Sequence, residues 1–298
     1  MSEALKGVAA MVVVCTVWGL SGIYYKLLSH IPPIEILAHR TLWSLIFFAA
    51  VLLIQGRIGL VGQALGNRRS AAIIVFAALM ISLNWFVFIT SIQIGKAMEA
   101  SLGYYTFPLV AVLLGAIAFR ERLARTQQLA VALAAAAVIT LTVGLGVAPW
   151  IALILASSFG LYGLAKKGLS VGPVVSVTTE VLILSPIALV VLWIVHSGGQ
   201  GAFGTTWRDS ALLAFSGPLT ATPLILFSYA TRRITYATVG LVQYLNPTLQ
   251  FLVATFVFRE VFSPWHAVAF AMIWTALALY TTAAWRQDRA ARRALESS

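Results

Sequence analysis

Two stretches of the sequence decide the fold: YTFPLVAVLLGAIAFRE at residues 105–121 and YLNPTLQFLVATFVFRE at residues 244–260. Each is almost wholly apolar until its closing Arg-Glu, which is typical of a helix that crosses a membrane. Aligned without gaps, they are identical at six of seventeen positions, including a tyrosine, the proline three residues later and the closing Phe-Arg-Glu. The two stretches therefore predict a membrane protein that contains an internal repeat.

The composition of the whole chain agrees with this prediction. Of its 298 residues, 60% are apolar and 10% are charged, and the mean hydropathy is +0.93. In soluble domains about a quarter of the residues are charged, because such side chains cover the surface that faces water. The composition excludes a soluble enzyme, a disordered chain and a coiled coil. The single cysteine, Cys15, excludes a disulfide within the chain.

Apolar stretches long enough to cross ~30 Å of hydrocarbon recur along the chain. The predicted spans are 5–28, 33–55, 70–93, 97–119, 125–145, 148–166, 173–196, 209–231, 235–258 and 265–285. Prolines mark several of the connections, where a helix cannot simply continue. We therefore expect an all-α, polytopic membrane protein with ten transmembrane helices in a lipid bilayer.

Lysines and arginines gather on one side of these spans. That side collects 15 of the 20, and the other side has Lys26, Lys96, Arg208 and Arg259. Because cytoplasmic loops are enriched in basic residues, both termini are expected in the cytoplasm. Topology thus explains the net charge of +11, so nucleic acid is not expected as a partner. The basic tail from Arg286 is interpreted as an anchor to lipid headgroups.

The repeat extends over both halves of the chain. Trp18–Lys26 aligns with Phe159–Lys167 at an offset of 141, and Arg40 corresponds to Glu180 at an offset of 140. Each repeat then holds five helices, an odd number, so the second repeat enters the membrane from the opposite side. We expect one repeat over residues 1–146 and an inverted repeat with the basic cytoplasmic tail over 147–298. Inverted repeats are typical of secondary transporters; the alternative is chance similarity between apolar helices.

The same motifs carry a resemblance to a known family. Ten helices in two repeats, the early Trp18-Gly19 and the run from Tyr105 to Leu123 resemble the EamA domains of the drug/metabolite transporter superfamily. The stretch 35–44, with Asn84-Trp85 in the third span, is similar to its RarD-like branch. The resemblance covers nearly the whole chain. It implies the export of amino acids or other small metabolites.

Polar and aromatic side chains inside the spans are the candidate solute contacts, because a polar group inside a membrane is costly and usually has a functional role. Tyr105 lies roughly 12 Å into its span and Asn84 roughly 21 Å along its own, too deep for an interfacial belt. The resemblance adds aromatic residues on helices that line the central path in the family. The full set is Trp18, Asn84, Tyr105, Phe159, Tyr162, Tyr229, Tyr244 and Asn246. Packing, or for Asn84 a hydrogen bond to another helix, is the alternative role.

Two prolines lie inside predicted spans at equivalent positions, Pro108 and Pro247. A proline within a helix removes one backbone donor and frees the carbonyl four residues earlier, here at Tyr104 and Gln243. Broken helices near the middle of the membrane are typical of transporter sites. We therefore expect both prolines to act as hinges, with a static kink as the alternative.

Two charged residues lie inside spans at corresponding places, Arg40 and Glu180, each roughly 10 Å past a proline. Either is a candidate for direct contact with the solute. Alternatively, Arg40 extends its side chain toward the surface and Glu180 is capped by a neighbouring hydroxyl. Glu35 and His39 share a helix face and are expected at an outer polar edge, with a proton relay as the alternative.

The sequence offers no enzyme chemistry. Its two aspartates, Asp209 and Asp288, lie at a loop edge and in the tail, and the common metal, nucleophile and phosphate-loop motifs are missing. We expect no catalytic or metal-binding residue, no cofactor and no ATP drive. The interpretation is a monomer-sized secondary carrier that exports small metabolites across the bacterial cytoplasmic membrane by alternating access. The alternative outside transporters is a membrane receptor or an accessory protein that does not transport a solute.

The same residues bear on the identity of the solute. A phosphorylated solute would need several converging basic side chains, whereas Arg40 alone lies inside a span. A purely apolar drug would not need buried amides and hydroxyls. An amino acid fits both facts, because its ammonium can lie over an aromatic face and its carboxylate can accept from Asn84 or a tyrosine. Drug-like amphipathic compounds are the alternative among transporters.

Overall fold

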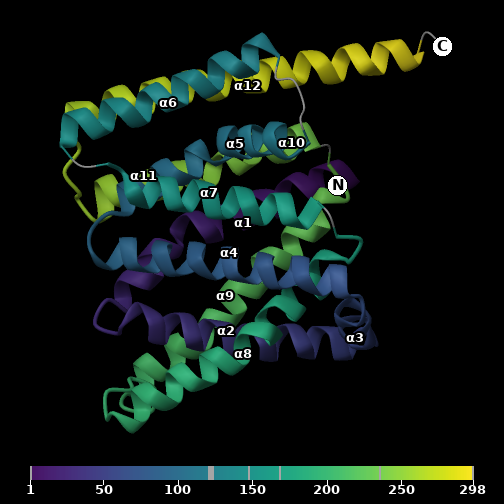
Figure 1. The fold of residues 1–298 in the computed structure, drawn as a ribbon. Coiled ribbons are helices and arrows are strands. Elements are labelled where there is room, and N and C mark those ends of the chain that lie inside the picture. Colours follow the sequence, from purple (N-terminus) through teal and green to yellow (C-terminus); the bar gives the residue numbers. More distant parts are fainter. Residues whose placement is uncertain (1, 120–123, 147, 168, 235, 297–298) are drawn as a thin grey trace.

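The computed structural model describes residues 2–119, 124–146, 148–167, 169–234 and 236–296. Apart from one isolated bridge between Phe203 and Thr206, the regular structure in these ranges is helical (Figure 1). The elements are α1 (Glu3–Leu27), α2 (Pro33–Ile54), α3 (Gly59–Gly66), α4 (Arg68–Gln93), α5 (Ala97–Phe119), α6 (Arg125–Leu145), α7 (Trp150–Lys167), α8 (Pro173–Ser197), α9 (Trp207–Thr231), α10 (Tyr236–Gln243), α11 (Leu245–Leu252), the π-helical turn η1 (Val253–Val257) and α12 (Pro264–Glu296).

Most of these helices match the predicted spans. Within the described residues, 8 helices are long and apolar enough to cross a membrane, and two apolar helical segments, Trp150–Lys166 and Leu245–Val257, are shorter. The expectation of an all-α membrane protein is confirmed. The expected count of ten is met only if the two shorter segments also cross.

Local sequence sets several helix ends. Pro33 and Pro173 occupy the first turn of α2 and α8, where the missing N–H would have no partner in any case. The side chain of Asn67 caps α4 by accepting from the backbone N–H of Arg69 and Ser70. Gly146 ends α6 in the left-handed conformation, with φ of 69°, which glycine adopts without steric cost.

The predicted span 235–258 is not one helix. α10 ends at Gln243, whose carbonyl is the one that Pro247 cannot bond, and α11 begins at Leu245. The chain then widens into the π-helical turn η1 before it leaves the helix. By contrast, α5 passes Pro108 without a break. The two equivalent prolines therefore have different local structures.

Two further differences concern segments outside the spans. The loop predicted near 56–69 contains the short helix α3. The final helix, α12, continues past residue 285 to Glu296, so the basic tail extends it beyond its neighbours (Figure 1).

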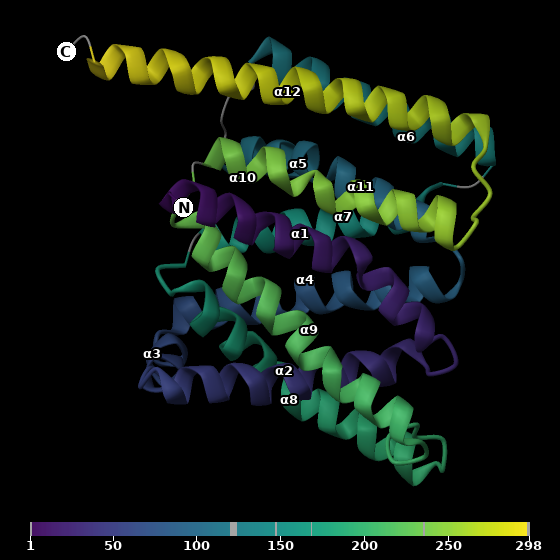
Figure 2. The ribbon, with the colours of Figure 1, turned by 180° about the vertical axis from the view of Figure 1, so that it is seen from behind.

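The helices pack in an ordered set of neighbours. α6 lies against α12 at one edge of the bundle, and α2 lies against α8 at the opposite edge (Figures 1 and 2). Between these edges, α1 packs on α9 and α11, and α7 packs on α4 and α5. Both termini lie toward the same end of the bundle in both views.

Glycines allow the closest of these contacts. A Cβ at Gly19 of α1 would lie 2.6 Å from the Cβ of Leu249 and 3.0 Å from the Asn246 carbonyl oxygen on α11. A Cβ at Gly103 of α5 would lie 2.9 Å from the Ala152 carbonyl oxygen on α7. Since real Cβ atoms almost never approach so closely, these helix pairs need glycine at the contact.

Candidate transport site

A buried arginine on α2 is the most unusual group between the helices. The Arg40 side chain stacks on the Trp85 ring of α4, with 4.0 Å between its guanidinium carbon and the ring centroid. Its Nη1 donates to the Tyr25 hydroxyl at 2.7 Å, while its Nε has no hydrogen-bond partner. Arg40 is 8% exposed. Among the described carboxylates, none pairs with it.

Aromatic residues from α1, α4 and α5 surround this cation. The Tyr25 ring meets Tyr24 at 4.9 Å and Phe88 at 5.9 Å, both edge to face. Phe88 in turn meets Tyr104 at 5.8 Å. We call this set, together with Arg40 and Trp85, the Arg40 cluster. It offers a positive charge, hydroxyl groups and aromatic faces in one place.

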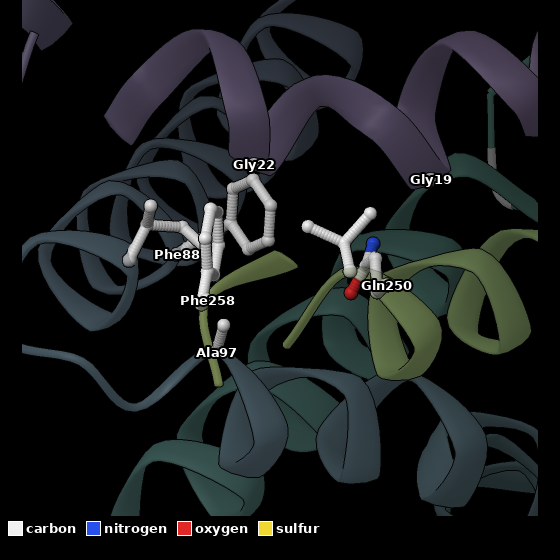
Figure 3. Close-up of a pocket in the computed structure, with 8 residues that line it drawn as sticks. Gly19, Gly22, Phe88, Ala97, Gln250 and Phe258 are labelled. Carbon is white, nitrogen blue, oxygen red and sulfur yellow. The ribbon is translucent and has the colours of Figure 1, made fainter. Parts of the chain in front are cut away.

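A small pocket adjoins the Arg40 cluster through Phe88, which belongs to both (Figure 3). It lies between α1, α4, α5 and the α11–η1 segment, and its lining residues are Gly19, Gly22, Phe88, Ile92, Ala97, Gln250, Val253 and Phe258. Gln250 is 6% exposed. Its Nε2 donates to Oδ1 of Asn246 at 2.9 Å, and its Oε1 has no partner among the described residues. The pocket is thus apolar with one free acceptor.

The predicted contact Asn84 lies beside the Arg40 cluster but is bonded to other helices. Its Nδ2 donates to the Leu155 carbonyl at 3.0 Å and to the Ser158 hydroxyl at 3.1 Å, both on α7. Its Oδ1 accepts from the Tyr104 hydroxyl at 2.8 Å. In this conformation Asn84 ties α4 to α5 and α7, which is one of the two roles that the sequence left open.

Residues near the two prolines join α5 to α11. The hydroxyls of Tyr105 and Thr248 lie 2.7 Å apart, and Ser101 donates to the Pro247 carbonyl at 2.9 Å. Tyr244 occupies the break between α10 and α11, where its carbonyl accepts from Thr248. The structure therefore brings Tyr105 to the broken helix rather than into the Arg40 cluster.

Two predicted contacts lie elsewhere. Trp18 packs on Phe227 of α9, with 6.0 Å between ring centroids. Tyr229 is 38% exposed near the end of α9, with the Arg233 guanidinium 3.5 Å from its ring centroid. The structure does not place either side chain in the Arg40 cluster.

A second polar group lies between α7 and α8, and we call it the Glu180 cluster. Glu180 is 1% exposed. Its Oε1 contacts Nζ of Lys166 and accepts from Ser176 at 2.9 Å, and its Oε2 accepts from Tyr162 at 3.2 Å. Phe159 stacks on Tyr162 at 6.0 Å. The neighbouring hydroxyl that the sequence offered as a cap for Glu180 is that of Ser176.

Sequence reasoning missed several residues of these sites. It counted Lys166 among the basic residues on the cytoplasmic side, at the end of the predicted span 148–166, whereas the side chain pairs with a buried carboxylate. A signal was available, because Lys166 aligns with Tyr25 just as Glu180 aligns with Arg40. Gln250 carried no comparable signal.

The expectation for Glu35 and His39 is wrong. Both are buried, at 0% and 5% exposure, because the connection between α8 and α9 covers them. The backbone N–H of Ala202 donates to Glu35 at 2.7 Å, and Phe203 stacks on the His39 ring at 5.0 Å. These residues lie beneath a loop rather than at an outer edge.

Comparison with known proteins identifies the family. Residues 5–143 match the EamA-like transporter family. The chain is 42% identical to the uncharacterized transporter YojE of Bacillus subtilis (strain 168) over 296 residues, 98% of each chain. It is 40% identical to protein RarD of Streptomyces exfoliatus over 283 residues, which are 94% of this chain and 90% of RarD. The chain belongs to the RarD-like branch of the EamA-like transporters.

Other similarities agree with this assignment. Protein RarD of Escherichia coli (strain K12) is 33% identical over 279 residues, covering 93% of the RarD-like chain described here and 94% of its relative. A solved crystal structure superposes with a TM-score of 0.60 at 18% identity, covering 96% of this chain and 98% of the other. That likeness shows a shared fold. The RarD-like chain is accordingly a multi-pass membrane transporter.

Proposed function

We propose that this RarD-like transporter is a secondary carrier that exports amino acids or similar small metabolites across the bacterial cytoplasmic membrane. The observation that carries the proposal is Arg40, a buried cation without a paired carboxylate among the described residues. The alternatives, a receptor without transport or an exporter of amphipathic drugs, do not call for such a group.

The chemistry of Arg40 favours a carboxylate as part of the solute. A charged group inside a membrane protein is costly unless it is paired, and a guanidinium presents a planar fork that matches a carboxylate. Its unpartnered Nε leaves donor capacity for that anion. One cation suits one carboxylate better than a phosphate group, which favours several converging basic residues.

The neighbouring pocket offers groups that can bind an ammonium group. The free Oε1 of Gln250 is an acceptor in an otherwise apolar wall, and an unmet buried acceptor costs free energy. Phe88 and Phe258 add aromatic faces that attract cations. A carboxylate near Arg40 and an ammonium near Gln250 together describe a zwitterion with a small side chain.

The transport cycle that we propose uses two inverted five-helix repeats, residues 1–146 and 147–298. Packing supports this division. Gly19 meets Leu249 of α11, and its equivalent Gly160 meets Leu114 of α5, so corresponding glycines contact corresponding helices. In the same way, α1 packs on α9 as α7 packs on α4, and α2 packs on α9 as α8 packs on α4.

The two repeats differ in conformation at the helix that contains the equivalent proline, because α10–α11 is broken whereas α5 is continuous. We propose that Pro247 acts as a hinge and that α5, which is continuous across Pro108, adopts a corresponding break in the opposite state. Both termini lie at one end of the bundle, which fits a chain with an even number of spans. The excess of basic residues supports the cytoplasm as the location of that end.

Counterflow of radiolabelled amino acids in proteoliposomes tests the proposal. We expect exchange by the wild type and its loss in Arg40→Met, because the variant removes the buried cation that is proposed to hold the carboxylate. Arg57→Met, at an exposed loop residue, is the matched control and should exchange normally. Overproducing cells should also tolerate toxic amino-acid analogues. Tolerance to bulky cationic drugs alone, without amino-acid exchange, would favour the drug exporter and contradict the proposal.

A further inference from the structure

We propose that Glu180 is the proton-binding site that couples export to the proton gradient. The inference rests on the proposed function, since it assigns a driving ion to the same carrier. The Glu180 cluster lies outside the Arg40 cluster and the pocket. It joins α7 to α8 in the second repeat, whereas Arg40 belongs to the first.

The geometry around Glu180 is that of a buried carboxylate beside a partly exposed lysine. Ser176 and Tyr162 donate to its two oxygens, at 2.9 and 3.2 Å, and Lys166 pairs with Oε1. The Glu180 side chain is 1% exposed, while that of Lys166 is 21% exposed. In the proposed cycle, the proton reaches the carboxylate past Lys166, the partly exposed partner of Glu180.

A purely structural role does not account for this arrangement. The cost of burying two charges often exceeds the gain from pairing them, so apolar residues would join α7 and α8 at least as well. Apolar packing is already present, since Val181 on α8 forms a cluster with Ile81 and Trp85 that Phe159 and Tyr162 cover. An ionisable residue inside a membrane protein is a functional group by default.

Trp85 connects the Glu180 cluster to the Arg40 cluster. Its ring stacks on the Arg40 guanidinium and belongs to the apolar cluster that Tyr162 covers. Tyr162 donates to Glu180. Loss of the negative charge at Glu180 would weaken its pairing with Lys166 and the hydrogen bond that it accepts from Tyr162, which alters the packing against the aromatic wall that Arg40 uses. This chain of contacts is a physical route for coupling between proton and solute.

The proton balance of the cycle is simple. On the outside, one Glu180 oxygen takes up a proton from water and becomes a neutral carboxylic acid, while Lys166 remains an ammonium. After the bundle reopens to the cytoplasm, the proton leaves and the ion pair forms again. With a zwitterionic solute moving outward, one positive charge moves inward per cycle.

Other ionisable groups on the helices around α8 are engaged elsewhere or exposed. On α2, Glu35 and His39 lie under the loop before α9 and Arg40 lies against Tyr25. On α9, Asp209 pairs with His30. The exposed ones are Arg68 and Arg69 on α4, Arg208 and Tyr229 on α9, and Arg57 before α3. Among the side chains that the structure describes, Lys166 and Tyr162 are thus the titratable groups in contact with Glu180.

Proteoliposomes with an acidic lumen separate coupling from exchange. With one proton per solute, a lumen one pH unit more acidic should support about tenfold accumulation of a radiolabelled amino acid by the wild type. Glu180→Gln should still exchange labelled for unlabelled amino acid, although more slowly, but should lose the accumulation. The matched control, Glu99→Gln, removes a carboxylate that also pairs with a lysine, Lys96, but at a helix end, and should accumulate like the wild type.

A double variant guards against misfolding, because Glu180→Gln alone leaves Lys166 without a counter-ion. Glu180→Gln with Lys166→Met removes both charges and should show the same loss of coupling. Accumulation by both variants at the wild-type level overturns the inference, as does loss of exchange in variants that remain monodisperse. Absence of exchange in the wild type would instead refute the proposed function, which this design therefore tests separately.

Discussion

At the scale of single residues, the chemistry of the candidate site depends on the planarity of Arg40 as well as its charge. The guanidinium stacks on Trp85 and also donates to Tyr25, which a lysine ammonium cannot reproduce because it is a compact point charge. An unpaired cation is tolerated there because aromatic faces and a hydroxyl partly replace its hydration.

Arg40→Lys should therefore weaken solute binding while preserving the charge. We expect the amino-acid concentration for half-maximal counterflow to rise by about tenfold or more, since a hydrogen bond to a charged group contributes about 1.5–3 kcal/mol. Arg57→Lys, in an exposed loop, should leave that concentration unchanged. An unaltered value in Arg40→Lys would show that the solute does not use the guanidinium fork.

At the scale of helices, two contacts tie the halves of the molecule together. Gly19 allows α1 to lie against α11. At the end of the same segment, Arg259 adopts a φ of 54°, a conformation rare for side chains larger than glycine. The following Glu260 accepts from the backbone N–H of Ala97 and Met98 at 2.7 and 2.8 Å, so it caps α5 from the other half of the chain.

Gly19→Ala should destabilise the fold, because the added methyl group would overlap the side chain of Leu249 and crowd the Asn246 carbonyl. We expect a loss of about 1–3 kcal/mol, the range typical of overpacked cores. Thermal unfolding of the purified protein in detergent provides the measurement. Gly163→Ala is the control, since a Cβ there would meet nothing within 4 Å and alanine favours a helix. Equal midpoints for the two variants would contradict the expectation.

The cap on α5 should make stability depend on pH. Burial is the largest influence on Glu260 and raises its pKa above the ordinary 4.5, although the two backbone donors act in the opposite direction. The contribution of a carboxyl group with a raised pKa is fully present below the ordinary value and is lost as pH rises through the raised one.

Glu260→Gln removes this titration. The unfolding midpoint of the wild type, relative to that of Glu260→Gln, should accordingly fall as pH increases from about 4.5. Midpoints of the two proteins measured across that window provide the check. A difference that stays constant or grows with pH would mean that the hydrogen bonds to α5 outweigh burial at this carboxyl group.

At the scale of the whole molecule, the proposed inverted repeat places equivalent motifs on opposite sides of the membrane. The closing Phe-Arg-Glu occurs at 119–121 and again at 258–260. If the first repeat enters the membrane from the cytoplasm, five spans lie between the two copies of this motif. Because five is odd, the two copies face opposite sides of the membrane. The basic residues predict which side each copy faces.

Reporter fusions test this topology. Alkaline phosphatase joined after Glu121 should be inactive, because that position is expected in the cytoplasm, and after Glu260 it should be active in the periplasm. A cytoplasmic fluorescent reporter should give the opposite pattern and serves as the control. Activity on the same side for both positions would refute the inverted arrangement.

The sequence by itself determined the helical membrane fold, the family and most helix ends. Those properties depend on the local length of apolar stretches and on the positions of proline and asparagine, as at Pro33 and Asn67, and both can be recognised without knowing what packs where. It also located Arg40 and Glu180 as charges inside spans. The alignment of the two halves came from identical residues that recur at a nearly constant offset.

Only the tertiary structure decided what these residues contact. Arg40 stacks on a residue 45 positions away, Trp85. Lys166, expected only as one of the basic residues on the cytoplasmic side, pairs with Glu180. The two equivalent prolines also lie in different local structures: the helix breaks after Gln243, before Pro247, whereas α5 continues past Pro108. Which side chains contact one another depends on how several helices pack together. The sequence of a single helix does not specify which residues of other helices lie beside it.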